Sequence, residues 1–364
     1  MQPSLPPSPT PRSSRRVGLH RPRVDAFRVY AMLWIIVAHS ELAIGFSGQP
    51  TLQVLALSIL VRAAVPLFFI LAGEHLGPRL LRDRAPGTGP RYMRRLATLF
   101  VGASLLYWLL DLAKLARRQG LGSAVGTLLA QASQDPVQLL FSGARMHLWF
   151  LMALMIVVAA ATLVLARSRV RIFVLVSAVL YGVGLAIGPY AGPLGIDPAR
   201  NWFVWLLQSP LFFALGVFFG LEQEHLPRRS TAVALVVAGL AVHTAEVLYL
   251  TSAYNAAPFR LAMLLGTVPY AAGVGLFAFE PRASRMDRWA ARFGGYVPTV
   301  YLIHMVFIEV LKPPRGRFPD LAVRVVLALL TIVLSFGTAA YLGRLLARGR
   351  RKRRMRVRAS LAMP

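Results

Sequence analysis

The sequence has 364 residues, of which 56% are hydrophobic and only 15% carry a charge. Soluble globular proteins are about 25% charged, so this composition excludes an ordinary soluble protein and indicates an integral membrane protein. The formal net charge of +27 would suggest nucleic-acid binding in a soluble chain. Here the basic residues lie in short clusters between apolar runs, and we expect no nucleic-acid partner. The absence of cysteine excludes disulfides and thiolate nucleophiles.

Two basic segments flank a long apolar centre. We expect residues 1–23 to form a disordered cytoplasmic tail, residues 24–346 to form one transmembrane domain, and residues 347–364 to form a second cytoplasmic tail. Charged residues interrupt the first apolar segment, where a signal peptide has a plain apolar centre. We therefore expect this segment to be retained as a helix.

Apolar segments of about 20 residues, the length that crosses a bilayer, recur through the transmembrane domain. They lie at residues 24–45, 52–78, 96–115, 147–166, 171–189, 202–221, 230–250, 259–279, 295–311 and 320–346. We therefore predict an all-α polytopic membrane protein with about ten transmembrane helices. Prolines are expected to kink or break four of these helices. They are Pro66, Pro210, Pro269 and Pro298. One short interfacial helix is expected near residues 124–132.

Arginines gather in alternate connections between the apolar segments. The basic connections lie at residues 79–95, 167–171, 228–229 and 282–292. Because short basic loops favour the cytoplasmic side, and because the number of spans is even, both termini are predicted to be cytoplasmic. The basic C-terminal tail is also expected to attract anionic lipid, at about 1 kcal/mol per basic residue near the surface.

The first apolar segment carries Asp25, Arg28 and His39. Ionisable residues are costly inside a bilayer and mark a candidate functional site. At about 100° and 1.5 Å per residue, Arg28 and His39 differ by about 20° around the helix axis and by about 16 Å along it, and Asp25 shares their face. A neutral imidazole is a usable base near pH 7, so this face is expected to line a cavity that reaches inward from the cytoplasm. The alternative is an anchoring arginine and a hydrogen-bonded packing histidine.

Arg62 lies near the middle of the second apolar segment, where an unpaired cation is costly. It could stabilise the oxyanion that develops on an acyl carbonyl, or it could form a structural ion pair. Three acidic residues are candidate partners for such a pair: Glu41, Glu74 and Asp111.

Later segments contain two further histidines that are candidates for a substrate site. His147 begins the fourth segment beside Trp149, where it is either an interfacial residue or part of an acceptor pocket. His304 lies three residues after Tyr301 in the ninth segment, so the two share one side of a helix. Taken alone, His147 is more simply explained as an interfacial residue and His304 as a packing residue.

Five short motifs follow one another in order along the chain. They are Asp25-Ala-Phe-Arg28 with ten further residues before His39-Ser40, Val65-Pro-Leu-Phe-Phe-Ile-Leu-Ala-Gly73, Arg91-Tyr-Met-Arg94, His147-Leu-Trp-Phe-Leu151 and Tyr301-Leu-Ile-His304. In this order and spacing they resemble the membrane-bound acyltransferase family 3, whose members include bacterial enzymes that acylate O-antigen and glucan. The resemblance covers nearly the whole chain. The sequence departs from it at Ala72, where a serine is common, and at Glu74-His75, where an aromatic or apolar residue usually follows.

The resemblance implies a membrane O-acyltransferase in the bacterial cytoplasmic membrane. It implies acyl-CoA as co-substrate, acetyl as the expected group, and a hydroxyl of a carbohydrate or glycolipid as the acceptor, with no bound cofactor or metal. It assigns three catalytic residues: His39 as the base or acyl carrier, Arg28 as the residue that steers or holds the donor, and Asp25 on the same helix face. Arginine suits the phosphates of coenzyme A. The expected donor-binding residues are Arg62, Arg91 and Arg94, and the expected acceptor-side residues are His147, Tyr301 and His304.

Two other function classes fit the same composition. A transporter or exporter of a polysaccharide precursor or small solute would use the buried charges as a substrate pathway without consuming acyl-CoA. No internal repeat is evident, which disfavours a transporter built from inverted repeats. A membrane scaffold protein would not require His39 at all. Acyl transfer from labelled acetyl-CoA distinguishes the enzyme from the transporter.

Overall fold

The computed structural model describes residues 21–40, 52–82, 87–167, 169–256, 261–312 and 321–361, with side chains described at all of these positions except 52–54 and 349–361. In these ranges the chain forms helices joined by turns and contains no strand. Residues 1–20 of the predicted N-terminal tail, and Glu41, lie outside the described residues.

The helices follow the predicted apolar segments. They are α1 (Pro22–His39), α2 (Leu52–Leu60), η1 (Val61–Ala63), α3 (Ala64–Arg82), α4 (Thr88–Gln119), α5 (Leu121–Gln134), α6 (Pro136–Ser142), η2 (Met146–Leu148), α7 (Trp149–Leu165), α8 (Val170–Ile187), α9 (Asn201–Leu221), α10 (Arg229–Tyr254), α11 (Thr267–Phe279), α12 (Arg285–Ala291), η4 (Gly294–Tyr296), α13 (Val297–Leu311) and α14 (Leu321–Leu361). Here η denotes a 3₁₀ turn.

Eight segments of the described chain are long and apolar enough to cross a membrane. They are Leu55–Arg82, Thr88–Gln119, Met146–Leu165, Val170–Ile187, Asn201–Leu221, Arg229–Tyr254, Arg285–Leu311 and Leu321–Arg348. The prediction of an all-helical, multi-pass membrane protein is therefore confirmed. Helix α1 carries three charged residues, and α11 has only 13 residues. These two helices account for the difference from the predicted ten spans, so the exact count stays a prediction.

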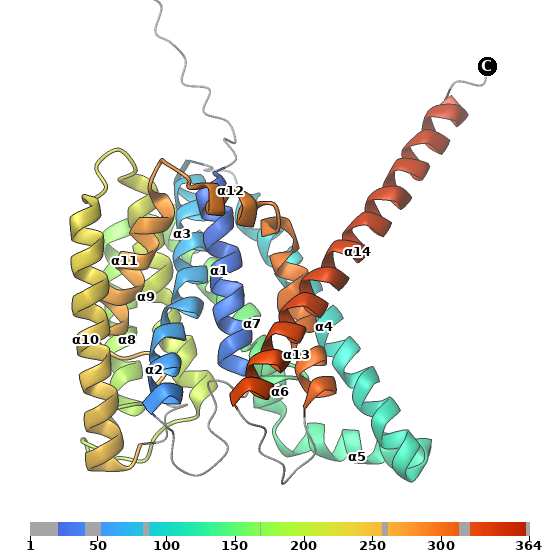
Figure 1. Cartoon of the computed structure of the whole chain (residues 1–364), viewed down its shortest axis with the longest axis horizontal. Coiled ribbons are helices and arrows are strands. Elements are labelled where there is room, and N and C mark those ends of the chain that lie inside the picture. The colour runs from blue at the N-terminus through green and yellow to red at the C-terminus, as the bar shows by residue number, and fades with distance from the viewer. Residues whose placement is uncertain are drawn as a thin grey trace, which may run out of the picture.

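Both ends of the described chain leave the bundle on the same side, and α14 projects away from it on that side (Figure 1). Helix α14 continues without interruption to Leu361, so the basic residues from 347 to 361 extend the last helix. The assignment of this side to the cytoplasm stays a prediction that rests on the arginine-rich connections.

One predicted feature of the connections needs correction. The connection between the third and fourth segments contains two helices, α5 and α6, in place of the single short helix expected near residues 124–132. The four prolines differ in their positions within the helices, and whether they kink them stays a prediction. Pro66 and Pro298 follow the 3₁₀ turns η1 and η4 and so mark breaks, and Pro269 lies in the first turn of α11. Pro210 lies inside an uninterrupted α9.

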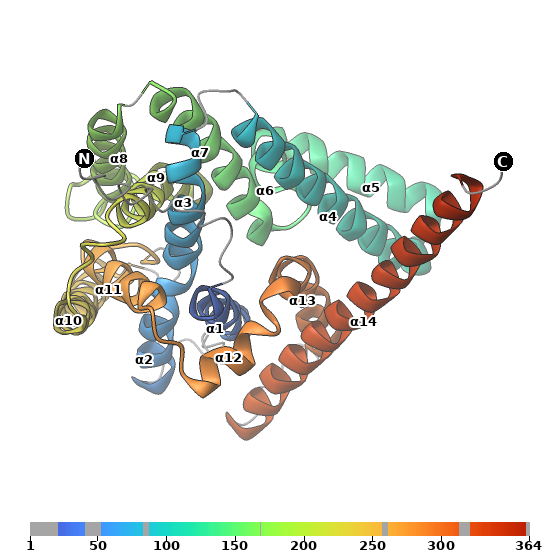
Figure 2. The ribbon, with the colours of Figure 1, turned by 90° about the horizontal axis from the view of Figure 1, so that it is seen from above.

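Helix α1 lies at the centre of the bundle (Figure 2). It contacts α3, α11, α12, α13 and α14. Ala26, Met32 and Ile36 of α1 are completely buried. Protein therefore surrounds α1 on several sides, and its charged residues lie within reach of neighbouring helices.

Helices α3 and α9 approach so closely that their backbones touch at glycines. A Cβ atom added to Gly73 would lie 2.1 Å from the carbonyl oxygen of Phe213, and one added to Gly216 would lie 2.0 Å from that of Ile70. Small residues at such crossings let membrane helices pack closely. This contact fixes α3, and with it the position of η1 at its start.

Gly73→Val is expected to destabilise the protein by about 1–3 kcal/mol, the usual cost of overpacking, because the new side chain would meet the α9 backbone. The measurement is the temperature at which detergent-purified protein loses its monodisperse elution peak. Gly182→Val is the matched control, because a Cβ there has nothing within 4 Å. Equal melting temperatures for the two variants would contradict the close crossing.

Candidate functional site

Three histidines from distant parts of the chain meet beside the C-terminal end of α1. They are His39 of α1, His147 of η2 and His304 of α13, and together we call them the histidine cluster. The ring centroids are 5.6 Å apart for His39 and His304, 6.5 Å for His39 and His147, and 5.3 Å for His147 and His304. The predicted catalytic histidine and the two predicted acceptor-side histidines therefore form one group.

Two tyrosines surround the histidine cluster. The Tyr301 hydroxyl donates to the backbone carbonyl of His147, and its ring centroid lies 5.6 Å from that of the same histidine. Tyr107 of α4 lies 5.4 Å from His147, ring centroid to ring centroid, and donates from its hydroxyl to the carbonyl of Leu302 at 2.7 Å. Tyr107 is completely buried. Tyr301 is predicted from the sequence as a site residue and Tyr107 is not, although a tyrosine in an apolar span needs a hydrogen-bond partner.

Hydrogen bonding fixes one tautomer in the cluster. The His304 Nδ1 atom lies 2.8 Å from the carbonyl oxygen of Tyr301. A carbonyl only accepts, so Nδ1 carries the hydrogen and the neutral ring presents Nε2 as an acceptor. His304 Nε2 and both ring nitrogens of His147 are buried and have no hydrogen-bond partner among the described residues. Such groups cost about 1–3 kcal/mol each when left unpaired, so the cluster is suited to bind a polar group.

The three rings differ in accessibility. His304 is fully buried and His147 is 6% exposed, whereas His39 is only partly buried. By residue exposure, His39 is therefore the most accessible member of the cluster. The described residues contain no group of three or more His, Cys, Asp or Glu side chains arranged to hold a metal ion.

Arg62 belongs to the same end of α1. It lies on η1, close enough for an electrostatic interaction with both His39 and the buried His243 of α10. Two of the acidic partners suggested for it are engaged by other arginines. Glu74 binds Arg21 at 2.9 Å, and Asp111 binds Arg145 at 2.6 Å.

Arg28 lies toward the other end of α1 and binds Asp25 at 2.7 Å, with both side chains partly exposed. Arg28 also lies close enough to Glu74 and His75 of α3, and to Tyr92 of α4, for an electrostatic interaction with each. The polar face of α1 that was predicted from the sequence is therefore directed at neighbouring helices. That this face lines a cavity open to the cytoplasm stays a prediction.

The predicted donor-binding arginines divide into two groups. Arg91 and Arg94 are exposed in the first turns of α4, the helix that also carries Tyr92, beside Arg28. Arg62, in contrast, lies with the histidine cluster. One group therefore lies at each end of the Arg28–His39 face, about 16 Å apart by helical rise.

The chain matches the family model of the acyltransferase domain of acyltransferase family 3 over residues 21–340. This protein belongs to acyltransferase family 3. The match begins one residue before α1 and ends within α14, so it includes every candidate site residue. The resemblance to this family is thereby confirmed.

A curated protein of Enterococcus faecalis named "Amino-acid racemase" is 24% identical over 352 residues. The alignment covers 92% of this acyltransferase family 3 chain but 47% of that protein, so the chain spans about half the length of the curated relative that it matches. The name describes that protein as a whole. No solved structure matches the chain.

In this member of acyltransferase family 3, an ion network holds the segment that carries His147. Arg145 binds Asp111 through both terminal nitrogens, at 2.6 and 2.7 Å, and binds Glu309 through Nε at 2.8 Å. Lys114 also binds Glu309, at 2.6 Å. The Arg145 guanidinium lies 5.2 Å from the centre of the Tyr107 ring, which in turn packs on His147. The network therefore ties α4 and α13 to the residue two positions before His147.

Arg145→Ala is expected to lower the rate of acyl transfer at least about tenfold, which corresponds to about 1.4 kcal/mol. The substitution removes the cation shared by Asp111 and Glu309, so η2 and His147 lose their fixed position. The matched control is Lys114→Ala, because Lys114 is 52% exposed and contacts only one of the two carboxylates. Initial rates of both variants, measured at equal amounts of folded protein, check this. Equal rates would contradict a positioning role for Arg145.

Proposed function

We propose that this protein is a membrane O-acyltransferase of the bacterial cytoplasmic membrane. It transfers an acyl group, expected to be acetyl, from cytoplasmic acyl-CoA to a hydroxyl of a carbohydrate or glycolipid acceptor. The observation that carries the proposal is the histidine cluster of a family 3 acyltransferase chain, in which His39 alone is more than marginally exposed. Acyl-CoA is a co-substrate, and the lipid bilayer is the protein's environment.

His39 is the proposed reactive group. In direct transfer, its neutral imidazole removes the proton from the acceptor hydroxyl while that oxygen attacks the thioester carbonyl. The carbon–sulfur bond then breaks, and the proton on the imidazole passes to the departing thiolate. In the relay alternative, an imidazole nitrogen attacks the thioester first, and the acceptor hydroxyl then displaces the imidazole. Both routes release free coenzyme A and an acyl ester.

The neighbouring groups have proposed roles that follow from their positions. Arg62 stabilises the negative charge that develops on the carbonyl oxygen in either route. His147 and His304 supply acceptors for polar hydrogens of the acyl acceptor, and Tyr301 holds the backbone of His147. Their proposed place is therefore on the acceptor side of the reaction.

Arg28, Arg91 and Arg94 are the proposed donor-binding residues. Guanidinium groups bind phosphate oxygens in pairs, and Arg28 lies about 16 Å along α1 from His39. A donor bound at both places needs its phosphates and its thioester separated by a long flexible arm. Coenzyme A has this form, which supports it as the donor. Asp25 fixes the guanidinium of Arg28 through their ion pair.

Incubation of membranes with acetyl-CoA labelled in the acetyl group tests the proposal. Membranes that contain the protein are expected to move label into the lipid or glycan extract and to release stoichiometric free coenzyme A. Membranes from the same host without the protein are the control. Solute movement that requires Arg28 and His39 but consumes no acetyl-CoA would contradict the proposal and support a transporter.

A further inference from the structure

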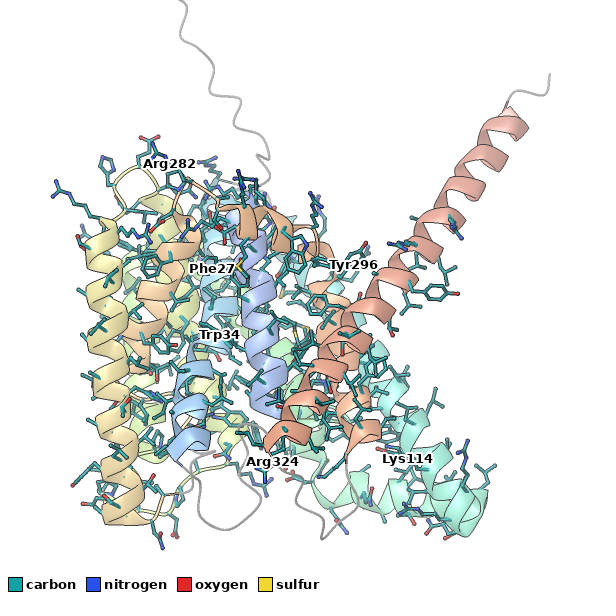
Figure 3. All side chains as sticks on the ribbon, viewed as in Figure 1. Phe27, Trp34, Lys114, Arg282, Tyr296 and Arg324 are labelled. Atoms are coloured by element: carbon teal, nitrogen blue, oxygen red, sulfur yellow. The ribbon has the colours of Figure 1, made fainter. Side chains whose placement is uncertain are left out.

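An apolar cavity of about 260 Å³ lies beside α1, between this helix, α3 and α11. Its lining residues are Phe27, Tyr30, Leu33, Trp34, Leu67 and Val274. Four of these are on α1, and Trp34 follows Phe27 by seven residues, or about 10 Å along the axis. Figure 3 labels both residues on this helix, with Arg282 at the end of the bundle nearest to Phe27.

The cavity is separate from the histidine cluster. His39 follows Tyr30 by nine residues, which places the two about 180° apart around α1. The cavity therefore lies behind the helix that carries the proposed reactive group. A molecule in it cannot be the acyl group that reacts at His39, so the inference below does not rest on the proposed function.

The lining selects an aliphatic occupant. Only two of the six side chains carry a polar atom, the Tyr30 hydroxyl and the Trp34 indole nitrogen, and the Tyr30 hydroxyl already donates to Asp287 at 3.1 Å. A sugar or phosphate would lose most of its hydrogen bonds with water here and gain few in return. The surrounding bilayer supplies hydrocarbon chains, which need no hydrogen bonds.

The Phe27 end of the cavity adjoins a cationic rim that begins with Arg23, whose guanidinium carbon lies 5.7 Å from the centre of the Phe27 ring. Arg23 binds Glu280 at 3.1 Å, lies 3.9 Å from Asp287 and donates to the carbonyl of Phe277 at 2.5 Å. Four further arginines, all exposed, lie on the adjoining segments and outnumber the two carboxylates. They are Arg229, Arg282, Arg285 and Arg288. Excess positive charge beside a membrane attracts anionic lipid headgroups.

We propose that this cavity binds one acyl chain of an anionic phospholipid, whose headgroup lies at the arginine rim and whose chain runs from Phe27 toward Trp34. A bound chain fills the space between α1, α3 and α11 and supports α1 from the side opposite the histidine cluster. The binding partner is therefore a membrane phospholipid, distinct from donor and acceptor.

Quenching of Trp34 fluorescence by brominated lipid tests this proposal, because bromine quenches tryptophan only on close approach. The full-length protein is reconstituted in phosphatidylcholine with a small fraction of phosphatidylglycerol whose acyl chains carry bromine. The contribution of Trp34 is the signal lost in Trp34→Phe. We expect Trp34 to be quenched at least twofold more by brominated phosphatidylglycerol than by brominated phosphatidylcholine at the same fraction.

Filling the cavity is expected to prevent this quenching. Val274→Phe should reduce the quenching of Trp34 at least twofold, whereas Val237→Phe on the exposed face of α10 should not. Leu33→Phe, at a partly exposed lining position, provides the same comparison if Val274→Phe fails to fold. Unchanged Trp34 quenching in the filled variants would overturn the chain-binding site. Equal quenching by the two brominated lipids would overturn its preference for an anionic headgroup.

Discussion

Replacing His39 with alanine is expected to reduce the initial rate of acyl transfer at least about 100-fold, the lower range for loss of a general base, while the protein still accumulates in the membrane. The physical reason is that His39 is the accessible member of the histidine cluster, whereas His147 and His304 are buried. The measurement is label transferred from acetyl-CoA per unit of folded protein.

The control for this experiment is a histidine outside the cluster. His225 has an 81% exposed side chain in the connection after α9, so His225→Ala should leave the rate within about twofold of wild type. Unchanged acylation in His39→Ala would remove His39 from the chemistry. Loss of His39→Ala protein from the membrane would instead indicate that the ring is required for packing.

The second large effect is expected at Arg28. Replacing it with lysine keeps the charge but removes the planar group that binds two phosphate oxygens at once. A charged hydrogen bond contributes about 1.5–3 kcal/mol, so KM for acyl-CoA should rise by about 10-fold to 100-fold. The expected change lies mainly in KM, because Arg28 is about 16 Å along the helix from His39 and does not touch the reacting atoms.

Arg169→Lys is the matched control for Arg28→Lys. Arg169 is exposed in the basic connection between α7 and α8. Like Arg28 it contributes positive charge on the side predicted to be cytoplasmic, but it belongs to a connection away from α1. Its substitution should not change KM. If Arg28→Lys kept a near-normal KM, Arg28 would be a membrane anchor, and donor binding would need other residues.

The polar face of α1 was predictable because it depends only on the periodicity of one helix. Asp25, Arg28 and His39 are related by helical geometry alone, and the structure keeps residues 22–39 in a single helix. The helical segments were predictable for a similar reason, since the length of an apolar segment indicates whether it can cross the membrane as a helix.

The histidine cluster was not predictable from spacing. His147 and His304 are separated from His39 by more than a hundred residues, and each taken alone is explained by packing. Their meeting depends on how η2 and α13 are placed relative to the end of α1. Helical periodicity within one segment contains no information about these long-range contacts.

The sequence indicates less clearly the charged residues that hold His147 in place. Asp111 and Glu309 interrupt apolar spans, and such residues usually have a partner of opposite charge. Their partner, Arg145, lies in a connection where positive charge is ordinary, so its role became visible only from its contacts in the structure. The apolar cavity behind α1 could not be predicted either, because each of its lining residues, taken alone, has the properties of an ordinary packing residue.

The most direct test of the account is to determine where the acyl group of the donor lies. A coenzyme A thioester whose acyl group carries a photoreactive diazirine is irradiated with the membrane-embedded protein, and the labelled peptides are identified by mass spectrometry. We predict label on peptides that contain His39, His147 or His304, with loss of label when excess acetyl-CoA is present. Label that is confined to other peptides, or that acetyl-CoA does not displace, would contradict acyl transfer at the histidine cluster.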